Sequence, residues 1–505
     1  MKNFISAIVL ILLLSIVNHT NAQWTQIGQD IDGEAGHDQS GYSVSLSSDG
    51  LVVAIGAWNN DGNGNSSGHV RIYENQSGIW TQIGSDIDGE AAEDQFGISV
   101  SLSSDGSIVA IGAPLNDGNG SEAGHVRIYE NQSGIWTQIG NDIDGEAAGD
   151  LSGYSISLSS DGTILAIGAY CNDGNDTTDT YRGHVRVYGN QSGTWVQIGS
   201  DIDGEAAGDY SGYSVSLNSN GSILAIGAYD NDGNGSAAGH VRVYENQLGT
   251  WIQIGSDIDG ESAEDKSGWS VSLSSDGTIL AIGAIYNDGN GSLAGHVRVY
   301  ENQTGVWTKI GSDIDGEAAS DRSSWSVSLS SDGSVVAIGA IHNNDNGNHA
   351  GHVRVYENQS STWTQIGSDI DGEAAGDLSG ESVSLSSDGT IVAIGAHGND
   401  GNGVDAGHVR VYSNPTVGIN ENTINTEVLI YPNPTTGIIR VEAEGMESVE
   451  VFDIYGKEVY PKVKSQKTNI KSQKYELDLS QHAKGIYVIK VTTDKGVFLE
   501  KVVLE

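Results

Sequence analysis

Three kinds of residue are scarce in this 505-residue chain, and each scarcity has a consequence. There is only 1 cysteine, Cys171, so no disulfide can form within a monomer, and we expect this thiol to be incidental rather than reactive. The 5 prolines stand against 70 glycines, a balance that predicts many loops. Lysine and arginine number 23 against 67 acidic residues, giving a formal net charge of −44.

The negative charge belongs to the first part of the chain. From Val428 onward 11 basic residues balance 11 acidic ones, so the part before Val428 holds 12 basic and 56 acidic residues. Because phosphate binding requires Lys and Arg, such a surface excludes nucleic acid and anionic lipid as partners. Cations, basic proteins and neutral ligands such as glycans remain compatible with it.

Long apolar runs are also missing, apart from one near the N-terminus. Residues 1–22 combine Lys2, a mostly apolar run from Ala7 to Val17 and small residues before a cleavage site between Ala22 and Gln23. This pattern predicts a signal peptide that is too short for a stable membrane span. The protein is therefore expected to be exported, with no membrane span.

The most prominent positive feature is a repeat. Tryptophan recurs at 24, 80, 136, 195, 251, 307 and 363, with a spacing of 56 residues except for one of 59, and we number the seven copies by these residues. Copy four contains four strand-like runs at Trp195–Gly199, Tyr213–Ser219, Ser222–Ala228 and His240–Glu245. A period this long, held over seven copies, indicates a solenoid or a propeller.

Four antiparallel strands repeated seven times predict an all-β, seven-bladed β-propeller over residues 23–412. The two chain ends fit this architecture. Trp24–Gly28 precedes the first full set of strands, and the last set ends at His408–Tyr412 with no Trp strand after it. Residues 24–28 would pair with residues 408–412 and close the ring. An open β-solenoid is the alternative, and it leaves the match between the ends unexplained.

One copy carries a family signature. Copy two contains Phe96-Gly97 and then Gly112-Ala113-Pro114, which resembles the FG-GAP signature of the repeats that form the integrin α-subunit head. The resemblance covers residues 23–412 and implies a seven-bladed propeller in an extracellular, adhesion-type protein. The integrin calcium loop lies between the two inner strands, where this chain has only a short Ser-Ser-Asp-Gly turn. The family's metal ligands are therefore not carried over.

The C-terminal part has a different character. After a polar linker at residues 413–427, residues 428–505 lose the 56-residue period and predict a small β-sandwich. Tyr431-Pro432-Asn433-Pro434, Asp453-Ile454-Tyr455-Gly456-Lys457 and Gly485-Ile486-Tyr487 resemble the sorting domain of the type IX secretion system of Gram-negative bacteria. This resemblance implies that the type IX machinery is a partner, and that the protein ends at the outer-membrane surface or outside the cell.

An acidic loop of pattern Asp-x-Asp-Gly-Glu-x-x-x-Asp occurs in all seven copies and supplies 28 of the 56 acidic residues before Val428. Positions one, three, five and nine match EF-hand ligands, but Gly stands at position four and no acid at position twelve. Calcium is a candidate cofactor, and a structural acidic turn is the alternative. We expect that the four carboxylates of one loop do not share a centre. The candidate ligands in two loops are Asp86, Asp88, Glu90, Asp94, Asp142, Asp144, Glu146 and Asp150.

Another repeated motif, Gly-His-Val-Arg, places His and Arg on one strand face. Equivalent histidines on different blades cannot gather into one site. A structural pairing with acidic-loop carboxylates is the favoured interpretation.

Ligand binding is expected where the copies differ. The residue after each Ile-Gly-Ala and the residue before each inner strand vary, and both flank strand ends, where aromatic rings could stack on sugars or receive a protein loop. Packing between blades is the alternative. Glu381 and His397 occupy these positions in copy seven. The candidate ligand-binding residues are Tyr42, Trp58, Tyr154, Tyr170, Tyr213, Tyr229, Trp269 and Trp325.

No nucleophile elbow, zinc motif or phosphate-cradling loop is present, and near-identical repeats rarely supply an asymmetric catalytic constellation. We therefore predict no catalytic residue. The expected function is a secreted or cell-surface, non-catalytic propeller that mediates adhesion or binds a glycan or protein. A glycan-active enzyme on a propeller scaffold and a structural surface-layer protein are the alternatives.

Overall fold

The computed structural model describes residues 23–174, 180–414 and, with short gaps, 428–504. The signal peptide with Ala22, linker residues 415–427 and the sorting-motif segments 432–434 and 454–457 lie outside the described residues. The chain divides into two compact units, Met1–Gly418 and Ile419–Glu505. Every helix or strand assigned in the described residues is a β-strand, which confirms the all-β prediction.

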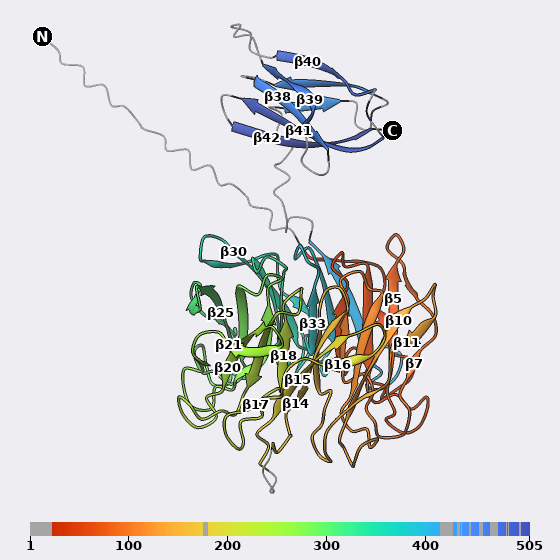
Figure 1. The fold of residues 1–505 in the computed structure, drawn as a ribbon, viewed down its shortest axis with the longest axis vertical. Coiled ribbons are helices and arrows are strands. Elements are labelled where there is room, and N and C mark those ends of the chain that lie inside the picture. The colour runs from red at the N-terminus through yellow and green to blue at the C-terminus, as the bar shows by residue number, and fades with distance from the viewer. Residues whose placement is uncertain are drawn as a thin grey trace, which may run out of the picture. The chain divides into compact units, whose positions relative to one another are not determined.

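The first unit consists of seven sheets built on one plan (Figure 1). In one of them β8, β9, β10 and β11 follow one another antiparallel, and the two-residue strand β12 pairs with β10 beside β11. Each sheet therefore has five strands, one more than the sequence indicates, because an Ile-Asp pair of the acidic loop joins the ladder. A propeller fold results.

The five strand types recur in every sheet. The innermost strands are β3 (Ser43–Leu46), β8 (Ser99–Leu102), β13 (Ser155–Leu158), β18 (Ser214–Leu217), β23 (Ser267–Leu273), β28 (Ser323–Leu329) and β33 (Ser382–Leu385). The second strands are β4 (Val52–Ala57), β9 (Ile108–Ala113), β14 (Ile164–Ala169), β19 (Ile223–Ala228), β24 (Ile279–Ala284), β29 (Val335–Ala340) and β34 (Ile391–Ala396). The third strands are β5 (His69–Asn75), β10 (His125–Asn131), β15 (His184–Asn190), β20 (His240–Gln247), β25 (His296–Gln303), β30 (His352–Asn358) and β35 (His408–Ser413).

The two outer types are short. The tryptophan strands are β1 (Thr25–Gln26), β6 (Trp80–Gln82), β11 (Trp136–Gln138), β16 (Trp195–Gln197), β21 (Thr250–Gln253), β26 (Val306–Lys309) and β31 (Trp363–Gln365). The acidic-loop strands are β2 (Ile31–Asp32), β7 (Ile87–Asp88), β12 (Ile143–Asp144), β17 (Ile202–Asp203), β22 (Ile258–Asp259), β27 (Ile314–Asp315) and β32 (Ile370–Asp371).

One sheet combines the two ends of the first unit. Its order is β1-β35-β34-β33, and β1 pairs with β35 through Thr25 opposite Ser413 and Gln26 opposite Tyr412. The Trp24 side chain is 4% exposed, and its indole N–H donates to the Ile366 carbonyl oxygen at 2.9 Å. The N-terminal strand thus completes a sheet whose other strands come from the end of the repeat.

Two series of hydrogen bonds join neighbouring sheets and return to their starting point. In the inner series, each backbone N–H donates to the carbonyl oxygen of the equivalent residue in the next sheet, at 2.8–3.0 Å, through Ser48, Ser104, Ser160, Ser219, Ser275, Ser331, Ser387 and back to Ser48. In the outer series, each tryptophan indole N–H donates to an isoleucine carbonyl oxygen of the preceding copy, as Trp136 does to Ile83 at 2.8 Å. The sheets therefore form a closed ring.

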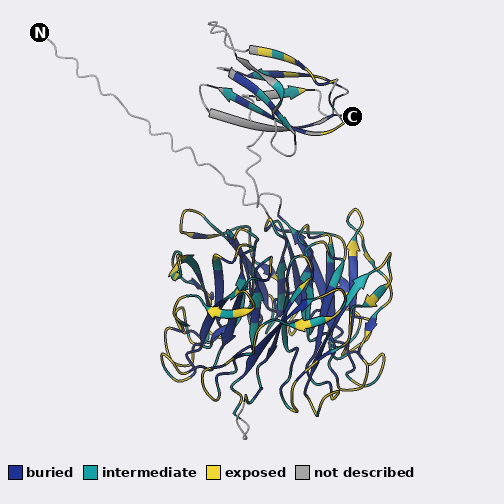
Figure 2. Cartoon of the chain, viewed as in Figure 1, coloured by how far each residue is buried: buried dark blue, intermediate teal, exposed yellow. Residues whose placement is uncertain are grey.

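The core lies between the sheets rather than within any one of them. Second strands such as β9 are buried along most of their length, since a sheet packs on each of their faces (Figure 2). A Cβ at Gly112 would collide with the Gly153 carbonyl oxygen of the next copy, so the Ile-Gly-Ala glycine permits close approach of the two sheets. Equivalent leucines and serines at the ends of the innermost strands, from Leu46 to Ser387, line a hollow of about 150 Å³.

The second unit is a sandwich of two sheets. One has the order β36 (Val428–Tyr431), β37 (Ile438–Ala443), β40 (Gln473–Asp478). The other has the order β39 (Glu458–Lys464), β38 (Met446–Asp453), β41 (Gly485–Thr493), β42 (Gly496–Leu504). A separate core that includes Ile439, Val451, Leu477 and Ile489 lies between them.

Ring closure should depend on Trp24. Replacing this buried indole by alanine in Trp24→Ala leaves a cavity and removes its bond to Ile366, so we expect a loss of about 3–5 kcal/mol in the free energy of unfolding. Thr25→Ala, at an exposed position of the same strand, should change it by less than about 0.5 kcal/mol. Chemical denaturation of both variants measures the difference, and equal stabilities would contradict closure by this strand.

Candidate functional site

Both variable positions lie at one end of the sheets. Ser155 pairs with Gly168, so Tyr154 before β13 and Tyr170 after β14 emerge side by side. The Asn/Asp/Gly-rich loops between second and third strands also emerge at this end, and glycines of these loops lie against alanines of the acidic loops, as Gly120 does against Ala148. We call this end the loop face.

All eight predicted ligand-binding residues pack within one network of rings, with Trp58 against Tyr42 and with Tyr170 and Tyr229 against Tyr213, and the other five form its axial part. In this axial cluster, the ring centroids of Tyr154 and Tyr213 are 5.1 Å apart, those of Tyr213 and Trp269 4.7 Å, and those of Trp269 and Trp325 5.0 Å. Tyr42 belongs to the cluster through Tyr154, and burial raises the pKa of both phenols. Aromatic pairs of this kind contribute about 0.5–1.5 kcal/mol each beyond burial. These rings therefore join the copies together at the axis.

Copies five and six adapt their backbone to the tryptophans of the cluster. β23 and β28 begin three residues earlier than the other innermost strands, and each contains a register shift, between Ser267 and Ser270 in the first and between Ser323 and Val327 in the second. Trp269 and Trp325 lie within these irregular segments. A bulge re-aims a side chain, which explains how the larger indoles fit where other copies have tyrosine, isoleucine or glutamate.

An acid and a histidine replace the aromatic residues in copy seven. Glu381 Oε2 lies 3.6 Å from His397 Nδ1, and both side chains are buried, with 6% and 15% exposure. Burial raises the pKa of Glu381 to about 7, although a hydrogen bond with the Trp325 side chain opposes the shift. Burial lowers the pKa of His397 to about 4. This pair is the asymmetric feature of the axis, and the sequence places it there without indicating its burial.

A pocket opens on the loop face at copies three and four. It has a volume of about 530 Å³ and combines four tyrosines with Cys171 and the acidic residues Glu122 and Asp173. Two of the tyrosines, Tyr170 and Tyr229, are predicted ligand-binding residues and also touch the axial cluster. We call this site the tyrosine pocket; its tyrosines are Tyr170, Tyr181, Tyr210 and Tyr229.

Three tyrosines of the pocket form a stack. Tyr181 and Tyr210 have ring centroids 5.6 Å apart and planes inclined by 11°, and Tyr210 and Tyr229 are 5.4 Å apart at 8°. The Lys266 ammonium lies 5.4 Å from the Tyr229 ring centre and pairs with Asp230. The outer end of the stack is accessible, since Tyr181 is 40% exposed.

Sequence reasoning missed Tyr181 and Tyr210. Their φ angles are 46° and 54°, and the equivalent residues of other copies also have positive φ, as Glu122 and Leu151 do. The Tyr210 backbone N–H donates to the Tyr181 carbonyl oxygen at 3.1 Å, as Leu151 does to Glu122 at 3.2 Å. The two positions therefore share their backbone conformation and hydrogen bond with the equivalent positions of other copies, whereas their side chains differ from copy to copy. The variation was visible in the sequence, but the contact between the two positions was not.

Cys171 lies in the wall of this pocket. Burial is the largest cause that raises the pKa of its thiol to about 11. The thiol is therefore protonated near neutral pH, and thiolate is the reactive form.

The four carboxylates of an acidic loop face different partners, although Asp30 and Asp32 of the first loop lie together beside His408. Asp94 and Asp150, at position nine, are buried and accept backbone N–H groups of their own loops, Ala91 at 3.2 Å and Ala147 at 2.9 Å. Each also accepts the side-chain amide of an asparagine from the same copy, Asn172 for Asp150 at 3.0 Å. Position nine is thus a cap that holds the loop in shape.

Carboxylates of successive loops meet instead. Glu90 lies with His125 and Asp142, and Glu146 lies with His184 and Asp201, each group having ligand atoms within 4.8 Å. Asp142 and Glu146 of one loop thus face different groups. Asp88 and Asp144 are exposed second residues of β7 and β12. Calcium binding by the predicted set stays a prediction.

The Gly-His-Val-Arg motif supplies the basic side of these groups. His184 Nδ1 lies 3.9 Å from Glu146 Oε2, and Arg186 Nη1 lies 3.8 Å from Glu146 Oε1. Burial lowers the pKa of the motif histidines His69 and His184 to about 4. The histidines lie beside acidic-loop carboxylates, as the sequence indicated, at distances of 3.8–4.0 Å, which are longer than a hydrogen bond.

Models of known protein families match parts of both units. A model of the secretion system C-terminal sorting domain matches residues 429–505, and an FG-GAP repeat model matches residues 30–73, 86–129 and 258–300. The chain carries FG-GAP repeats and a C-terminal sorting domain of the type IX secretion system. The sorting domain indicates export to the cell surface or the extracellular space. No helix in the described part is long and apolar enough to cross a membrane.

Solved structures similar to this FG-GAP repeat chain share little sequence with it. A putative 6-phosphogluconolactonase from Bacteroides uniformis has 14% identity and a TM-score of 0.45, covering 66% of this chain and 85% of its own. The Pseudomonas aeruginosa periplasmic gluconolactonase has 13% identity and a TM-score of 0.45, covering 86% and 95%. The β-propeller domain of the Trilobed protease from Pyrococcus furiosus has 10% identity and a TM-score of 0.40, covering 70% and 90%. No curated protein matches the chain.

The Glu381 carboxyl should make stability depend on pH. Its pKa rises from 4.5 in the unfolded chain to about 7, so the folded state holds the proton more tightly and loses stability as pH rises from about 4.5 to 7. Relative to wild type, Glu381→Gln should therefore gain about 3 kcal/mol in unfolding free energy between pH 5 and pH 8.

Urea unfolding at the two pH values measures this difference. Glu74→Gln, at an exposed position on β5, is the matched variant that also removes one carboxylate. If Glu381→Gln and wild type differ by the same amount at pH 5 and pH 8, the carboxyl is not titrating in this window.

Proposed function

We propose that this protein is an exported, non-catalytic propeller of a Gram-negative bacterium that acts in adhesion by binding an extracellular ligand in the tyrosine pocket. The observation that supports this proposal is the stack of Tyr181, Tyr210 and Tyr229 at a pocket of about 530 Å³. A concave site with aromatic walls and a few polar groups is the usual form of a small-ligand site. Part of the pocket, including Tyr170 and Tyr181, comes from copy three, which is three residues longer than the others.

A neutral glycan is the ligand class that fits best. Tyrosine rings offer flat apolar faces to the C–H groups of a sugar, while Glu122 and Asp173 offer acceptors for its hydroxyls. The net charge of −44 disfavours anionic glycans, since they would be repelled at long range. A protein loop with an aromatic or basic tip is the second ligand class that suits the same surface.

Two features favour binding over catalysis. Glycosidase chemistry normally uses two carboxyl groups facing the scissile bond. The Glu381 carboxyl, whose pKa is raised to about 7, is buried and faces an imidazole at 3.6 Å. The thiol of Cys171 has a raised pKa, which disfavours nucleophilic catalysis. Most other titratable groups of the loop face occur at equivalent positions in several copies. Such repetition is expected of residues with a structural role rather than a catalytic one.

The proposal predicts that binding depends on the tyrosine stack. A glycan array probed with the full chain identifies a ligand, and calorimetry then gives its affinity. Tyr181→Ala and Tyr210→Ala should each weaken binding about tenfold or more, or 1.4 kcal/mol. Tyr286→Ala, which removes a half-buried tyrosine of the loop face in copy five, should leave the affinity unchanged.

Three results would count against this function. An array of glycans and extracellular proteins without any binding would favour the surface-layer alternative. Binding that Tyr286→Ala and Tyr210→Ala weaken equally would place the ligand elsewhere on the loop face. Release of a cleaved product from a bound glycan would make the protein an enzyme.

A further inference from the structure

Copy six departs from the others in the loop between its second and third strands. Where the other six copies have Asp-Gly, copy six has Asn344-Asp345. Asn344 Oδ1 accepts the His349 backbone N–H at 2.8 Å, the same bond that Asp117 accepts from Glu122 at 2.8 Å in copy two. Asn344 therefore maintains the turn. The carboxylate has moved one residue along the chain, to Asp345.

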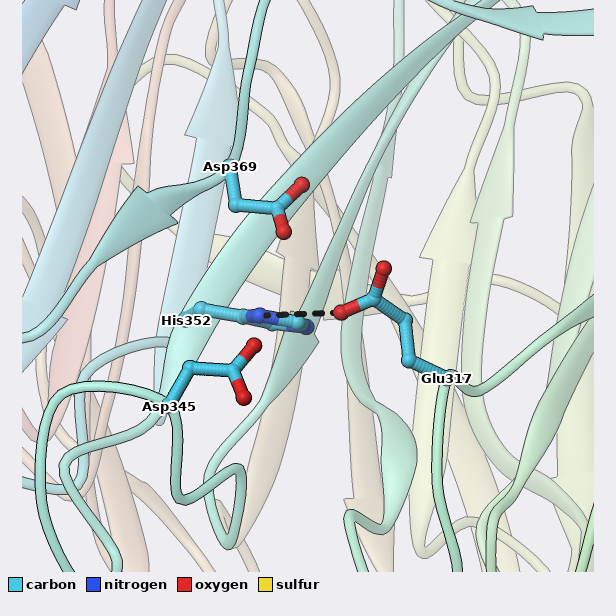
Figure 3. A group of neighbouring side chains, drawn as sticks. All are labelled: Glu317, Asp345, His352 and Asp369. Atoms are coloured by element: carbon cyan, nitrogen blue, oxygen red, sulfur yellow. Dashed lines mark ion pairs between the residues drawn. The ribbon is translucent and has the colours of Figure 1, made fainter.

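The displaced carboxylate enters an existing group of side chains (Figure 3). One ligand atom from each of Glu317, Asp345, His352 and Asp369 lies within 4.8 Å of the ligand atoms of the other three. Glu317 and Asp369 come from successive acidic loops, and His352 begins β30. The corresponding groups around His125 and His184 contain two carboxylates and one histidine.

His352 is the second observation that points to a ligand here. Its side chain is 0% exposed, and neither ring nitrogen has a hydrogen-bond partner among the described residues. The Nδ1 atom lies 3.9 Å from Glu317 Oε2, beyond hydrogen-bond distance. Leaving a buried polar group unpaired is unfavourable. A metal ion within the group would give this imidazole the partner that it lacks.

The charges around this group of side chains also favour a bound cation. The three carboxylates have one neighbouring guanidinium, that of Arg354, whose Nη1 lies 3.5 Å from Glu317 Oε1. Arg354 also donates from Nη2 to the Asp315 carbonyl oxygen at 2.8 Å, which holds it to one side of the group. One positive charge against three carboxylates leaves a surplus that a divalent cation would neutralise.

We propose that Glu317, Asp345, His352 and Asp369 form a binding site for a zinc-class divalent cation. Zinc takes four ligands from imidazole nitrogen and carboxylate oxygen, whereas calcium takes oxygen alone. Bonds of about 2.0–2.2 Å place tetrahedral ligand atoms roughly 3.5 Å apart, so the side chains must close by about an ångström. The three carboxylates can do this by rotation, because all three are partly or fully exposed.

Such an ion would connect three loops of the loop face. Glu317 belongs to the acidic loop of copy six, Asp345 to the loop between the second and third strands of the same copy, and Asp369 to the acidic loop of copy seven. Binding to the folded chain alone stabilises it in proportion to the logarithm of the free ion concentration. The site is separate from the tyrosine pocket, so zinc and glycan binding can fail independently.

Zinc calorimetry on the chelator-treated full chain tests the proposal, with two reciprocal variants. Asp345→Gly restores the glycine of the other copies and should lower zinc affinity about tenfold or more, because it removes a ligand. Gly62→Asp places a carboxylate at the equivalent position beside Glu34, His69 and Asp86, where Arg71 donates to the Asp32 carbonyl oxygen as Arg354 does to that of Asp315, and should add a second zinc per chain. Gly62 has no left-handed φ, so aspartate is compatible with its backbone.

A nearby pair of histidines provides the control. The His342 and His349 rings are stacked at 4.2 Å and partly exposed, so they could bind zinc by themselves. His349→Ala should leave the stoichiometry and affinity unchanged, and zinc should raise the melting temperature of wild type more than that of Asp345→Gly. Zinc binding lost in His349→Ala but retained in Asp345→Gly would overturn the proposal. So would calcium binding as tight as zinc that persists in His352→Ala.

Discussion

Each sheet of the propeller packs against a neighbouring sheet of nearly the same sequence, so its two faces must be complementary to each other. The rest of the structure depends on this constraint. The inner series of serine hydrogen bonds and the outer series of tryptophan hydrogen bonds both join one sheet to the next and return to their start. Between them, each Ile-Gly-Ala glycine brings the next backbone into contact, and serine hydroxyls accept backbone N–H groups across the gap, as Ser101 does from Leu158 at 3.0 Å. These positions are alike in all copies because a change in one would open the ring.

Outside the axial cluster, variation falls at positions such as Tyr181 and Tyr210, whose scaffold role needs only the backbone. Tyr210 and Tyr181 are joined through main-chain atoms, so their side chains are free to differ from those of other copies. Asn344 accepts the same backbone hydrogen bond as Asp117 does in copy two, so the turn does not need a carboxylate at this position. The carboxylate of copy six stands one residue later, at Asp345. The loop face therefore displays different side chains on one repeated backbone. The two candidate sites are departures of this kind, in copies three and four and in copy six.

The sequence was sufficient to predict the fold, because residues that recur with a fixed period make the same contacts in every copy. Trp24 stands one period before Trp80, and this spacing was enough to predict the pairing of β1 with β35. The repeat period does not predict which residues of neighbouring copies contact each other. Glu146 and Asp201 are 55 residues apart and meet at His184, so the sequence predicted that one loop's carboxylates do not share a centre but not which residues of the next copy they meet. The burial of Glu381 and its raised pKa depend on the axial cluster, which no single copy contains.

The acidity of the repeat follows from this shared geometry. Each acidic loop gives a glutamate to the arginine of a third strand and its position-nine aspartate to its own backbone, and the histidine of a third strand lies beside either a glutamate or an aspartate. The position-one aspartate accepts a side-chain N–H from the tryptophan strand, as Asp142 does from Gln138 at 2.6 Å. Three of the four carboxylates thus have scaffold roles, while the exposed aspartates on the short acidic-loop strands mainly add charge. The surplus disfavours anionic partners and is compatible with cations, basic proteins and uncharged ligands at the loop face. A tyrosine stack and an imidazole among carboxylates are the two kinds of site that can use those species.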